Sequence, residues 1–287
     1  MKPIRVSIDL ECWYHSDWFD FESLRKKYEI YTTLQDDVDF ILGVLKKFDV
    51  RITFFVLANL VQDYSDLIKN IHEDGHEIAS HGYSHANLSK LNDDQVLYEL
   101  QESKIILENT IHDKVHGFRA PCMRFPPLYY PLLSKLGYDY DSSVVPSLKI
   151  PGWYGNPHVP WIPYVLDTNG TKSLMEFPIS VFPILRLPSN GGWYLRNVGK
   201  WWINLITTAN SRFYNYAMLY IHPWEFSTGN PPYPEIPFHV FRKTGIFVRR
   251  FFQEFIQRYK LQHEDLTINS LYEKQNNSCN LIFSKRS

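Results

Sequence analysis

Short stretches rich in β-branched and aromatic residues alternate along the chain with longer stretches of helical periodicity, and this alternation most limits the possible folds. Strands are predicted at Ile4–Leu10, Arg51–Leu57, His76–His81, Val115–Ala120 and Ala217–His222. Helices are predicted between them at Leu34–Phe48, Leu60–Glu73, Asp93–Ile111 (with Asn92 as its cap) and Pro127–Leu136. Strands that alternate with long helices form right-handed βαβ units around a parallel sheet. The pattern therefore predicts an α/β fold.

The later part of the chain has a different amino-acid composition. Ser147–Gly192 is rich in Pro, Gly and Trp, which favours loops with short strands. Helices are then predicted at Asn197–Arg212 and Phe238–Tyr259. A chain of 287 residues, 44% of them hydrophobic, suits one α/β barrel. We therefore expect a single domain over residues 1–260, followed by a C-terminal tail at 261–287.

Charge and cysteine content limit the partners and the compartment. The formal net charge is −1, which gives no indication of a nucleic-acid partner. Three widely spaced cysteines do not suggest a disulfide framework. The N-terminal residues lack the apolar run of a secretory signal, and no apolar stretch is long enough to span a membrane. A cytoplasmic location is expected; peripheral membrane association and the oligomeric state are left open.

Two pairs of potential metal ligands or proton carriers stand at predicted strand ends. His81 and His85, in the stretch HGYSH, follow one strand, and a divalent metal such as zinc binds imidazoles of this kind. Asp9 and Glu11 are two residues apart on another strand, so both side chains share one face. One carboxylate could bind a metal while the other accepts a proton. A polar loop and a salt-bridged pair are the structural alternatives.

Two further strand ends carry one candidate each. Arg119 could orient a carboxylate through a bidentate contact, or form a structural ion pair. His222 could donate a proton to a leaving amine, although an isolated histidine is more often structural. In an α/β barrel the catalytic groups lie at the carboxyl ends of the strands, where all these residues are predicted to lie.

In combination these motifs resemble the polysaccharide deacetylase family, which is also called the NodB homology domain. Five motifs match in order: SIDLEC, HEIASHGYSH, GFRAP, GYDYDSS and YIHPWE. Further stretches, MEFPIS, LPSNGGWYLR and FRKTG, are similar to a subgroup found with exopolysaccharide biosynthesis. The resemblance covers roughly residues 4 to 255. It implies a distorted (β/α)7 barrel and a metal-dependent hydrolase that removes an N-acyl group, most often acetyl, from an amino sugar.

The resemblance also implies roles for individual residues. Asp9 would be the general base, oriented by Arg119, and His222 the general acid. The metal, zinc as first choice, would be bound by Glu11, His81 and His85. Asp141 of the fourth motif would tune the acid, with Asp139 as the competing candidate.

The first motif departs from the family pattern. The common form has two adjacent aspartates, whereas Leu10 here separates Asp9 from Glu11. Some relatives open cyclic ureides or imides without a metal, so a metal-independent, allantoinase-like amidohydrolase is the first alternative. A glycoside hydrolase that uses the two carboxylates is a second, and an inert sugar-binding module is a third.

Substrate contacts are expected from aromatic residues and from turns near the motifs. Rings can stack on a sugar face, and a glycine lets the backbone approach a ligand. The alternative for each residue is ordinary packing. The candidates are Trp13, Pro121, Gly192, Trp193, Tyr194 and Trp224. The substrate would be an amino sugar in a glycan, on a lipid carrier or on a nucleotide.

Overall fold

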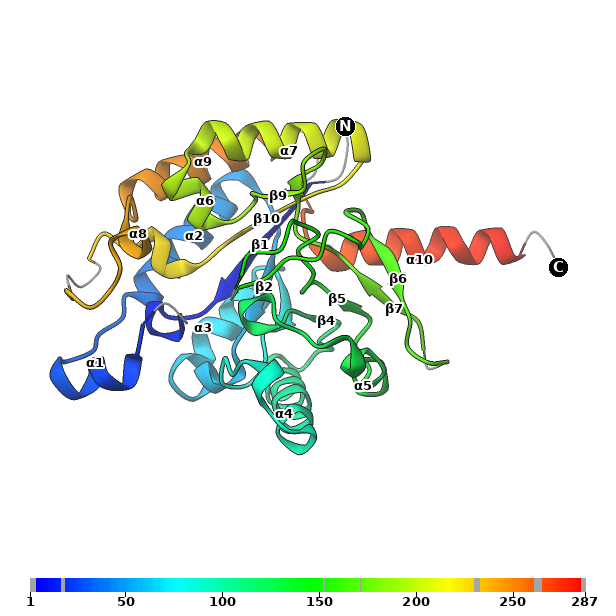
Figure 1. The fold of residues 1–287 in the computed structure, drawn as a ribbon, viewed down its shortest axis with the longest axis horizontal. Coiled ribbons are helices and arrows are strands. Elements are labelled where there is room, and N and C mark those ends of the chain that lie inside the picture. The colour runs from blue at the N-terminus through cyan, green and yellow to red at the C-terminus, as the bar shows by residue number, and fades with distance from the viewer. Residues whose placement is uncertain are drawn as a thin grey trace.

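The computed structural model describes residues 4–16, 19–151, 153–170, 172–229, 233–260 and 265–284, the side chains of residue 260 and of residues 277–284 excepted. Its centre is a curled sheet with helices around the outside (Figure 1). None of the helices in the described residues is long and apolar enough to cross a membrane.

The sheet contains seven parallel strands and one antiparallel edge strand. In spatial order they are β10 (Ala217–Ile221), β1 (Ile4–Leu10), β2 (Thr53–Val56), β3 (Glu77–Ser80), β4 (Gly117–Phe118), β5 (Tyr140–Asp141), β7 (Leu174–Glu176) and the antiparallel β6 (Tyr164–Leu166). A separate hairpin is formed by β8 (Val181–Phe182) and β9 (Leu187–Pro188). Seven parallel strands with outer helices make a distorted (β/α)7 barrel, and the predicted single-domain fold is confirmed.

Helices follow most of the strands, as expected for βαβ units. The outer helices are α2 (Leu34–Phe48), α3 (Val61–Glu73), α4 (Asp93–Ile111), α5 (Tyr130–Lys135), α7 (Lys200–Tyr214) and α9 (Ile246–Lys260). Shorter ones are α1 (Phe21–Lys27), α6 (Gly192–Asn197) and α8 (Phe238–Phe241). The predicted start of α4 is confirmed: Asn92 Oδ1 accepts a hydrogen bond from the N–H of Gln95 at 2.9 Å, and Gln95 Oε1 accepts one from the N–H of Asn92 at 3.1 Å.

The two faces of β1 show how the sheet positions polar groups. Ile4, Val6 and Ile8 are buried in the larger apolar core, which includes the inner sides of the outer helices. Ser7 and Asp9 alternate with them and therefore face the barrel interior. The apolar face drives the packing, while the other face is free to carry chemistry at the end of the strand.

Several predicted bounds differ from the structure by one to three residues, and two differences in the C-terminal part of the chain are larger. The helix expected at Phe238–Tyr259 is interrupted between α8 and α9, where Lys243 and Gly245 have φ of 54° and 72°. A Cβ at Gly245 would lie 2.9 Å from the carbonyl oxygen of Ser227, so the space there suits glycine only. Positive φ at two close positions is incompatible with a continuous helix.

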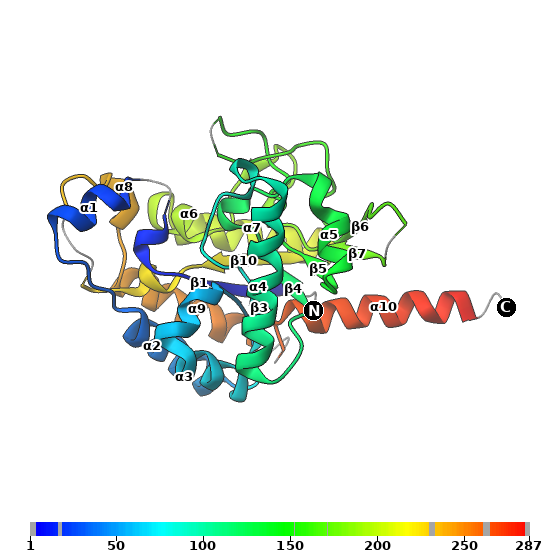
Figure 2. The ribbon, with the colours of Figure 1, turned by 90° about the horizontal axis from the view of Figure 1, so that it is seen from below.

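The segment expected as a tail contains a further helix, α10 (Ile268–Ser284). The carboxylate of Glu77 accepts hydrogen bonds from the N–H groups of Ile268 and Asn269 at 3.1 and 3.0 Å. The start of α10 is therefore attached to the barrel, and the rest of the helix runs away from its body in both views (Figures 1 and 2). The division at residue 260 stays a prediction, but the described residues beyond it include a helix that is hydrogen-bonded to the barrel.

Candidate active site

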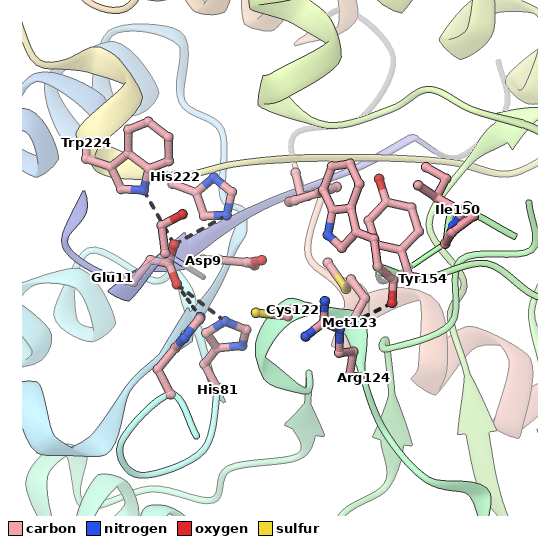
Figure 3. A pocket seen from close by; sticks show the side chains of 15 residues that line it. Asp9, Glu11, His81, Cys122, Met123, Arg124, Ile150, Tyr154, His222 and Trp224 are labelled. Carbon is pink, nitrogen blue, oxygen red and sulfur yellow. Dashed lines mark hydrogen bonds and ion pairs between the residues drawn. The ribbon is translucent and has the colours of Figure 1, made fainter. Parts of the chain in front are cut away.

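A cavity of about 420 Å³ opens at the carboxyl ends of the central strands (Figure 3). The ends of β1, β3 and β10, together with the loops that follow them, contribute most of its polar lining. The five predicted site residues among them are Asp9, Glu11, His81, His85 and His222. Parallel strands bring their carboxyl ends to one edge, so residues that are distant in the sequence meet there.

The loop that carries the two histidines is held in one conformation. Gly82 and His85 have φ of 83° and 66°, so the chain turns back over the end of β3. From α4, the carboxylate of Glu99 accepts hydrogen bonds from the N–H groups of Tyr83 and Ser84 at 2.8 and 3.0 Å. This partly buried contact holds the loop between the two histidines in place.

Glu11, His81 and His85 form a group with the chemistry of a metal site. One potential ligand atom from each lies within 4.8 Å of the other two. Nε2 of His85 lies 2.7 Å from Glu11 Oε2, and Nε2 of His81 lies 3.9 Å from it. Yet Glu11 Oε2 is buried and accepts no hydrogen bond of good geometry.

The protonation state of His81 also suits a metal ligand. Its Nδ1 lies 2.8 Å from the carbonyl oxygen of Arg119 and must donate to it, which leaves the Nε2 lone pair facing Glu11. Burial lowers the pKa of His81 to about 4, so the ring is neutral near pH 7. Two imidazoles and one carboxylate with room for further ligands match the donor set of a catalytic divalent cation.

Asp9 is held in place by Arg119. A guanidinium nitrogen of Arg119 lies 2.5 Å from Asp9 Oδ1 and the same nitrogen lies 2.7 Å from Ser7 Oγ. Nε of Arg119 also donates to the carbonyl oxygen of Ser142 at 3.0 Å. The guanidinium is completely buried and lies over the ring of Phe55 at 4.0 Å. Asp9 therefore stays beside the triad in a fixed orientation, as a hydrogen-bond acceptor.

His222 is held by a carboxylate that the sequence analysis did not identify. Nδ1 of His222 lies 2.8 Å from Glu225 Oε1, and its Nε2 lies 3.6 Å from Glu11 Oε1. The ring stacks on Trp224 with an interplanar angle of 18°. Burial favours neutral imidazole, but the charges of Glu11 and Glu225 outweigh it and raise the pKa of His222 to about 9. The available signal was the HPWE stretch, in which a glutamate follows the histidine by three residues.

The structure does not bring Asp141 to His222, which corrects the expectation that it tunes the acid. Tyr140 faces the barrel interior, so Asp141, the next residue on β5, faces outward. There it pairs in register with Glu176 and accepts a hydrogen bond from Ser143 at 2.6 Å. The competing candidate, Asp139, instead binds His116 at 2.6 Å.

Asp141 and Glu176 form a fully buried carboxyl pair. One oxygen of each, Asp141 Oδ2 and Glu176 Oε2, has no hydrogen-bond partner. Burial and the adjacent Asp141 raise the pKa of Glu176 well above its usual range, while burial raises that of Asp141 to about 6. The folded state thus holds a proton that the unfolded state releases, so the pair stabilises the fold at low pH and loses this contribution as pH rises from the ordinary carboxyl range.

Glu176→Gln is therefore expected to raise the free energy of unfolding at pH 8 by about 1–3 kcal/mol and to change it little at pH 4. The amide oxygen can still accept from the N–H of Val144, which now lies 3.0 Å from Glu176 Oε1, and the amide nitrogen can donate to Asp141. Urea denaturation at both pH values measures the effect. Glu73→Gln, at an exposed position on α3, is the control, and equal shifts in both variants would contradict the prediction.

Only one of the six residues predicted to contact substrate, Trp224, lines the cavity among the described residues. Trp13 is buried in a small apolar cluster, with its Nε1 donating to the carbonyl oxygen of Tyr31 at 2.9 Å. Trp193 donates to His239 at 3.2 Å. Tyr194 is not part of the lining, and its hydroxyl lies 3.1 Å from the hydroxyl of Tyr154, which does line the cavity. The structure therefore places these three residues in packing contacts, which is the alternative stated for each of them.

Pro121 and Gly192 are also absent from the lining. Pro121 is buried beside Gly82. At Gly192 a Cβ would lie 1.7 Å from Glu225 Oε2, so the space that the glycine leaves is filled by the carboxylate that holds His222. The glycine was expected to let the backbone approach a substrate, but it lets Glu225 approach the backbone.

Gly192→Ala should destabilise the protein by about 1–3 kcal/mol, because the new methyl group must displace a buried carboxylate. Gly43→Ala is a matched control on α2: a Cβ there meets nothing within 4 Å, and a stabilisation of about 0.5–1 kcal/mol is expected for an exposed helical position. Thermal unfolding of both variants tests the contrast. Equal melting temperatures would show that Glu225 does not require this space.

Most of the remaining lining comes from residues that the motifs did not mark. The loop after β4 supplies Cys122, Met123 and Arg124, whereas Tyr220 on β10 is the first residue of the fifth motif. The Pro- and Trp-rich region supplies Ile150, Pro151, Trp153 and Tyr154. The aromatic content of that region was visible in the sequence, but not the side of the barrel on which it lies.

Comparison with known families agrees with this geometry. Residues 27–140 match the family described as polysaccharide deacetylase, and residues 142–260 match a domain of unknown function, DUF3473. The peptidoglycan-N-acetylglucosamine deacetylase of Bacillus cereus is 32% identical over 120 residues, which is 40% of this chain and 42% of that protein. The peptidoglycan deacetylase of Helicobacter pylori is 25% identical over 167 residues, 54% of this chain and 52% of that protein. The chain thus spans about half the length of these relatives or less.

Solved structures share the fold at low sequence identity. A Mycobacterium smegmatis structure of the polysaccharide deacetylase type has a TM-score of 0.65 at 18% identity and covers 96% of this chain and 91% of its own. The allantoinase PuuE has a TM-score of 0.59 at 17% identity, with 92% and 86% covered. The matched family, the relatives and the barrel agree, and residues 27–140 match the polysaccharide deacetylase family.

Proposed function

We propose that this protein is a carbohydrate de-N-acetylase that hydrolyses the acetamido group of an amino sugar with the help of a divalent cation, with zinc as first choice. The observation that carries the proposal is the meeting of three groups in one cavity: the Glu11–His81–His85 triad, Asp9 fixed by Arg119, and His222 fixed by Glu225. The named activities of the peptidoglycan deacetylase relatives support the same reaction class.

Glu11, His81 and His85 would hold the cation. A divalent cation at such a site supplies a Lewis acid, which polarises a carbonyl oxygen and lowers the pKa of water from about 16 towards roughly 7. Because Arg119 keeps the Asp9 carboxylate beside the triad, Asp9 can accept the proton of the attacking water.

His222 completes the reaction. Its Nδ1 is held by Glu225, so its Nε2 faces the cavity and can deliver a proton to the amine nitrogen as the C–N bond breaks. The products are then acetate and a free amino sugar. A proton acceptor and a proton donor in one cavity are what amide hydrolysis requires, because an amine leaves poorly without protonation.

The alternatives differ in what these residues must do. A glycoside hydrolase would need Asp9 and Glu11 as a free acid and nucleophile. Instead, Asp9 is paired with Arg119, and Glu11 faces two imidazoles. Metal-independent opening of a cyclic ureide remains the second candidate, because the allantoinase PuuE shares the fold.

The deciding experiment measures acetate released from N-acetylated oligosaccharides by the purified protein, before and after chelation. Release that is lost with a chelator and restored by added zinc supports the proposal. Consumption of allantoin that persists after chelation would support the alternative. The place in polysaccharide or exopolysaccharide biosynthesis, the sugar carrier and a cytoplasmic location stay predictions.

A further inference from the structure

We propose that the protein docks on the surface of an anionic phospholipid bilayer through one face of the barrel. This face, called the α7 face here, is formed by α7, the tip of the β8–β9 hairpin and the start of α9. Its apolar side chains would enter the headgroup layer, while basic side chains beside them would face the lipid phosphates. The inference concerns binding to a surface and goes beyond the proposed function.

Large apolar side chains project from the α7 face. At the tip of the hairpin Ile184 is 80% exposed, and Leu185 beside it is also exposed. On α7 Trp201 is 61% exposed, and Leu205, one turn later, is exposed as well. Isolated apolar residues are common on protein surfaces, whereas several large ones on neighbouring elements mark a contact surface.

Side-chain contacts join these elements into one face. Phe182 of β8 stacks on Trp202 of α7, with ring centroids 5.7 Å apart, so the hairpin lies along one side of the helix. Two positions earlier, and therefore on nearly the opposite side of α7, Lys200 pairs with Glu254 of α9 at 3.1 Å. Lys200 also lines a hollow of about 460 Å³ together with Ile246 at the start of α9. The exposed stripe of α7 thus lies between the hairpin and α9, at the edge of the molecule opposite α4 (Figure 1).

The charge distribution along the chain favours an anionic surface. Residues 177–253 contain eight lysine and arginine residues but only two acidic ones, Glu225 and Glu235, although the whole chain has a net charge of −1. Glu225 is buried beside His222, and Glu235 is paired with Lys27. The segment that builds the α7 face is therefore basic, and the rest of the chain is acidic.

Basic side chains stand next to the exposed apolar ones. Lys200 directly precedes Trp201, and Arg250 lies one turn after Ile246 on α9. Lys243, just before α9, is exposed like these two cations. The ion pair of Lys200 is at the surface, where such pairs are weak and can be exchanged for a lipid phosphate. Tryptophan is favoured at the level of lipid headgroups, and each basic side chain near an anionic bilayer strengthens binding.

A second copy of this chain is a poorer occupant of the α7 face. Symmetric pairing would bring the same cations of two copies together, and like charges across an interface oppose association. A nucleic acid would meet the cations, but it offers nothing to the apolar tip at Ile184 and Leu185. Apolar side chains that project beside cations are typical of segments that lie in the bilayer interface.

Vesicle binding tests this proposal with the purified full-length protein. The probes are vesicles of phosphatidylcholine alone and vesicles that also contain phosphatidylglycerol, separated from unbound protein by flotation. At low salt we expect at least about ten-fold tighter binding to the anionic vesicles, since one basic side chain near such a surface contributes about five-fold. The preference should weaken with added salt, because exposed charges are screened.

Two double variants separate the apolar and the basic contributions. Ile184→Ser Trp201→Ser should lower binding to anionic vesicles by about ten-fold, since binding scales with the apolar area that enters the interface. Lys243→Gln Arg250→Gln should remove most of the preference for anionic vesicles. Thermal unfolding checks that each variant is folded. The matched controls, at exposed positions on other faces, are Leu97→Ser Ile105→Ser and Lys114→Gln Lys135→Gln, and both should bind like the wild type.

The results that would overturn the inference are specific. They are equal binding to neutral and anionic vesicles, no binding to either, or undiminished binding by the folded Ile184→Ser Trp201→Ser variant. A stable dimer that dissociates in the same variant would also overturn it, because a second copy would then cover the face. Asp9→Asn protein should bind vesicles as the wild type does, so loss of deacetylation and loss of docking are separate results.

Discussion

Replacing Asp9 by Asn is expected to lower kcat for deacetylation by about 10²–10⁴-fold, the usual contribution of a positioned general base. Asparagine has nearly the same shape as aspartate, so the cavity and the triad keep their geometry. The amide cannot take up the proton of the attacking water, and KM should change little because the other lining residues are untouched.

The contacts around Asp9 should hold the asparagine of the variant in the same position. Arg119 approaches Asp9 at 2.5 Å and also contacts Ser7 at 2.7 Å, so the amide oxygen of the variant can still accept a hydrogen bond from the guanidinium. Removing the charge does leave Arg119 with a weaker partner, and a loss of stability must be measured separately by thermal unfolding.

Asp139→Asn is the matched control for this variant. Asp139 is bound to His116 at 2.6 Å, is not part of the lining of the cavity and belongs to the same family motif as Asp141. Its substitution should leave kcat within about two-fold, as expected for a position away from the reacting groups. Near-normal turnover in Asp9→Asn protein that remains folded would remove Asp9 from the role of base.

Much of the fold could be predicted because the strands alternate in a readable way. On β1, the apolar residues Ile4, Val6 and Ile8 fall on one face and Asp9 on the other, and the structure confirms both the strand and its bounds. The long helices α2 and α4 also have the predicted bounds, since their apolar periodicity extends over several turns.

Short elements gave no such signal. β5 has two residues, too few for any periodicity, and which of Tyr140 and Asp141 faces the interior depends on its pairing with β4 and β7. The prediction that Asp141 lies near His222 therefore rested only on its place in the fourth family motif, whereas the strand pairing turns its side chain outward. The carboxylate beside His222 comes instead from Glu225.

The roles of aromatic residues and glycines were predicted least well, because packing decides them. Trp13 and Trp224 are both near site motifs in the sequence, yet only Trp224 lines the cavity. Gly192 was interpreted as a turn residue. The space that its missing side chain leaves is filled by the carboxylate of Glu225, 33 positions later in the sequence. Contacts between residues so far apart follow from the barrel and not from local sequence.

His222→Ala is expected to lower kcat for an N-acetyl sugar by about 10²–10⁴-fold, because the amine must leave without a proton donor. The loss should be much smaller for an aryl acetate such as p-nitrophenyl acetate, whose phenolate leaves readily without protonation. Asp9→Asn should impair both substrates, since each requires activation of water. This difference between the two variants separates the donor from the acceptor, which neither rate alone can do.

The contact with Glu225 predicts an intermediate case. Glu225→Gln keeps an oxygen to accept the hydrogen bond from His222 Nδ1, now 2.8 Å away, but removes the charge that favours the protonated ring. Its kcat for the N-acetyl sugar should fall by less than that of His222→Ala, again with the aryl ester spared. His158→Ala, at an exposed position, is the control for loss of an imidazole. If His222→Ala impaired the aryl ester as severely as the amide, His222 would have to act before the leaving group departs, and its assignment as the proton donor would be wrong.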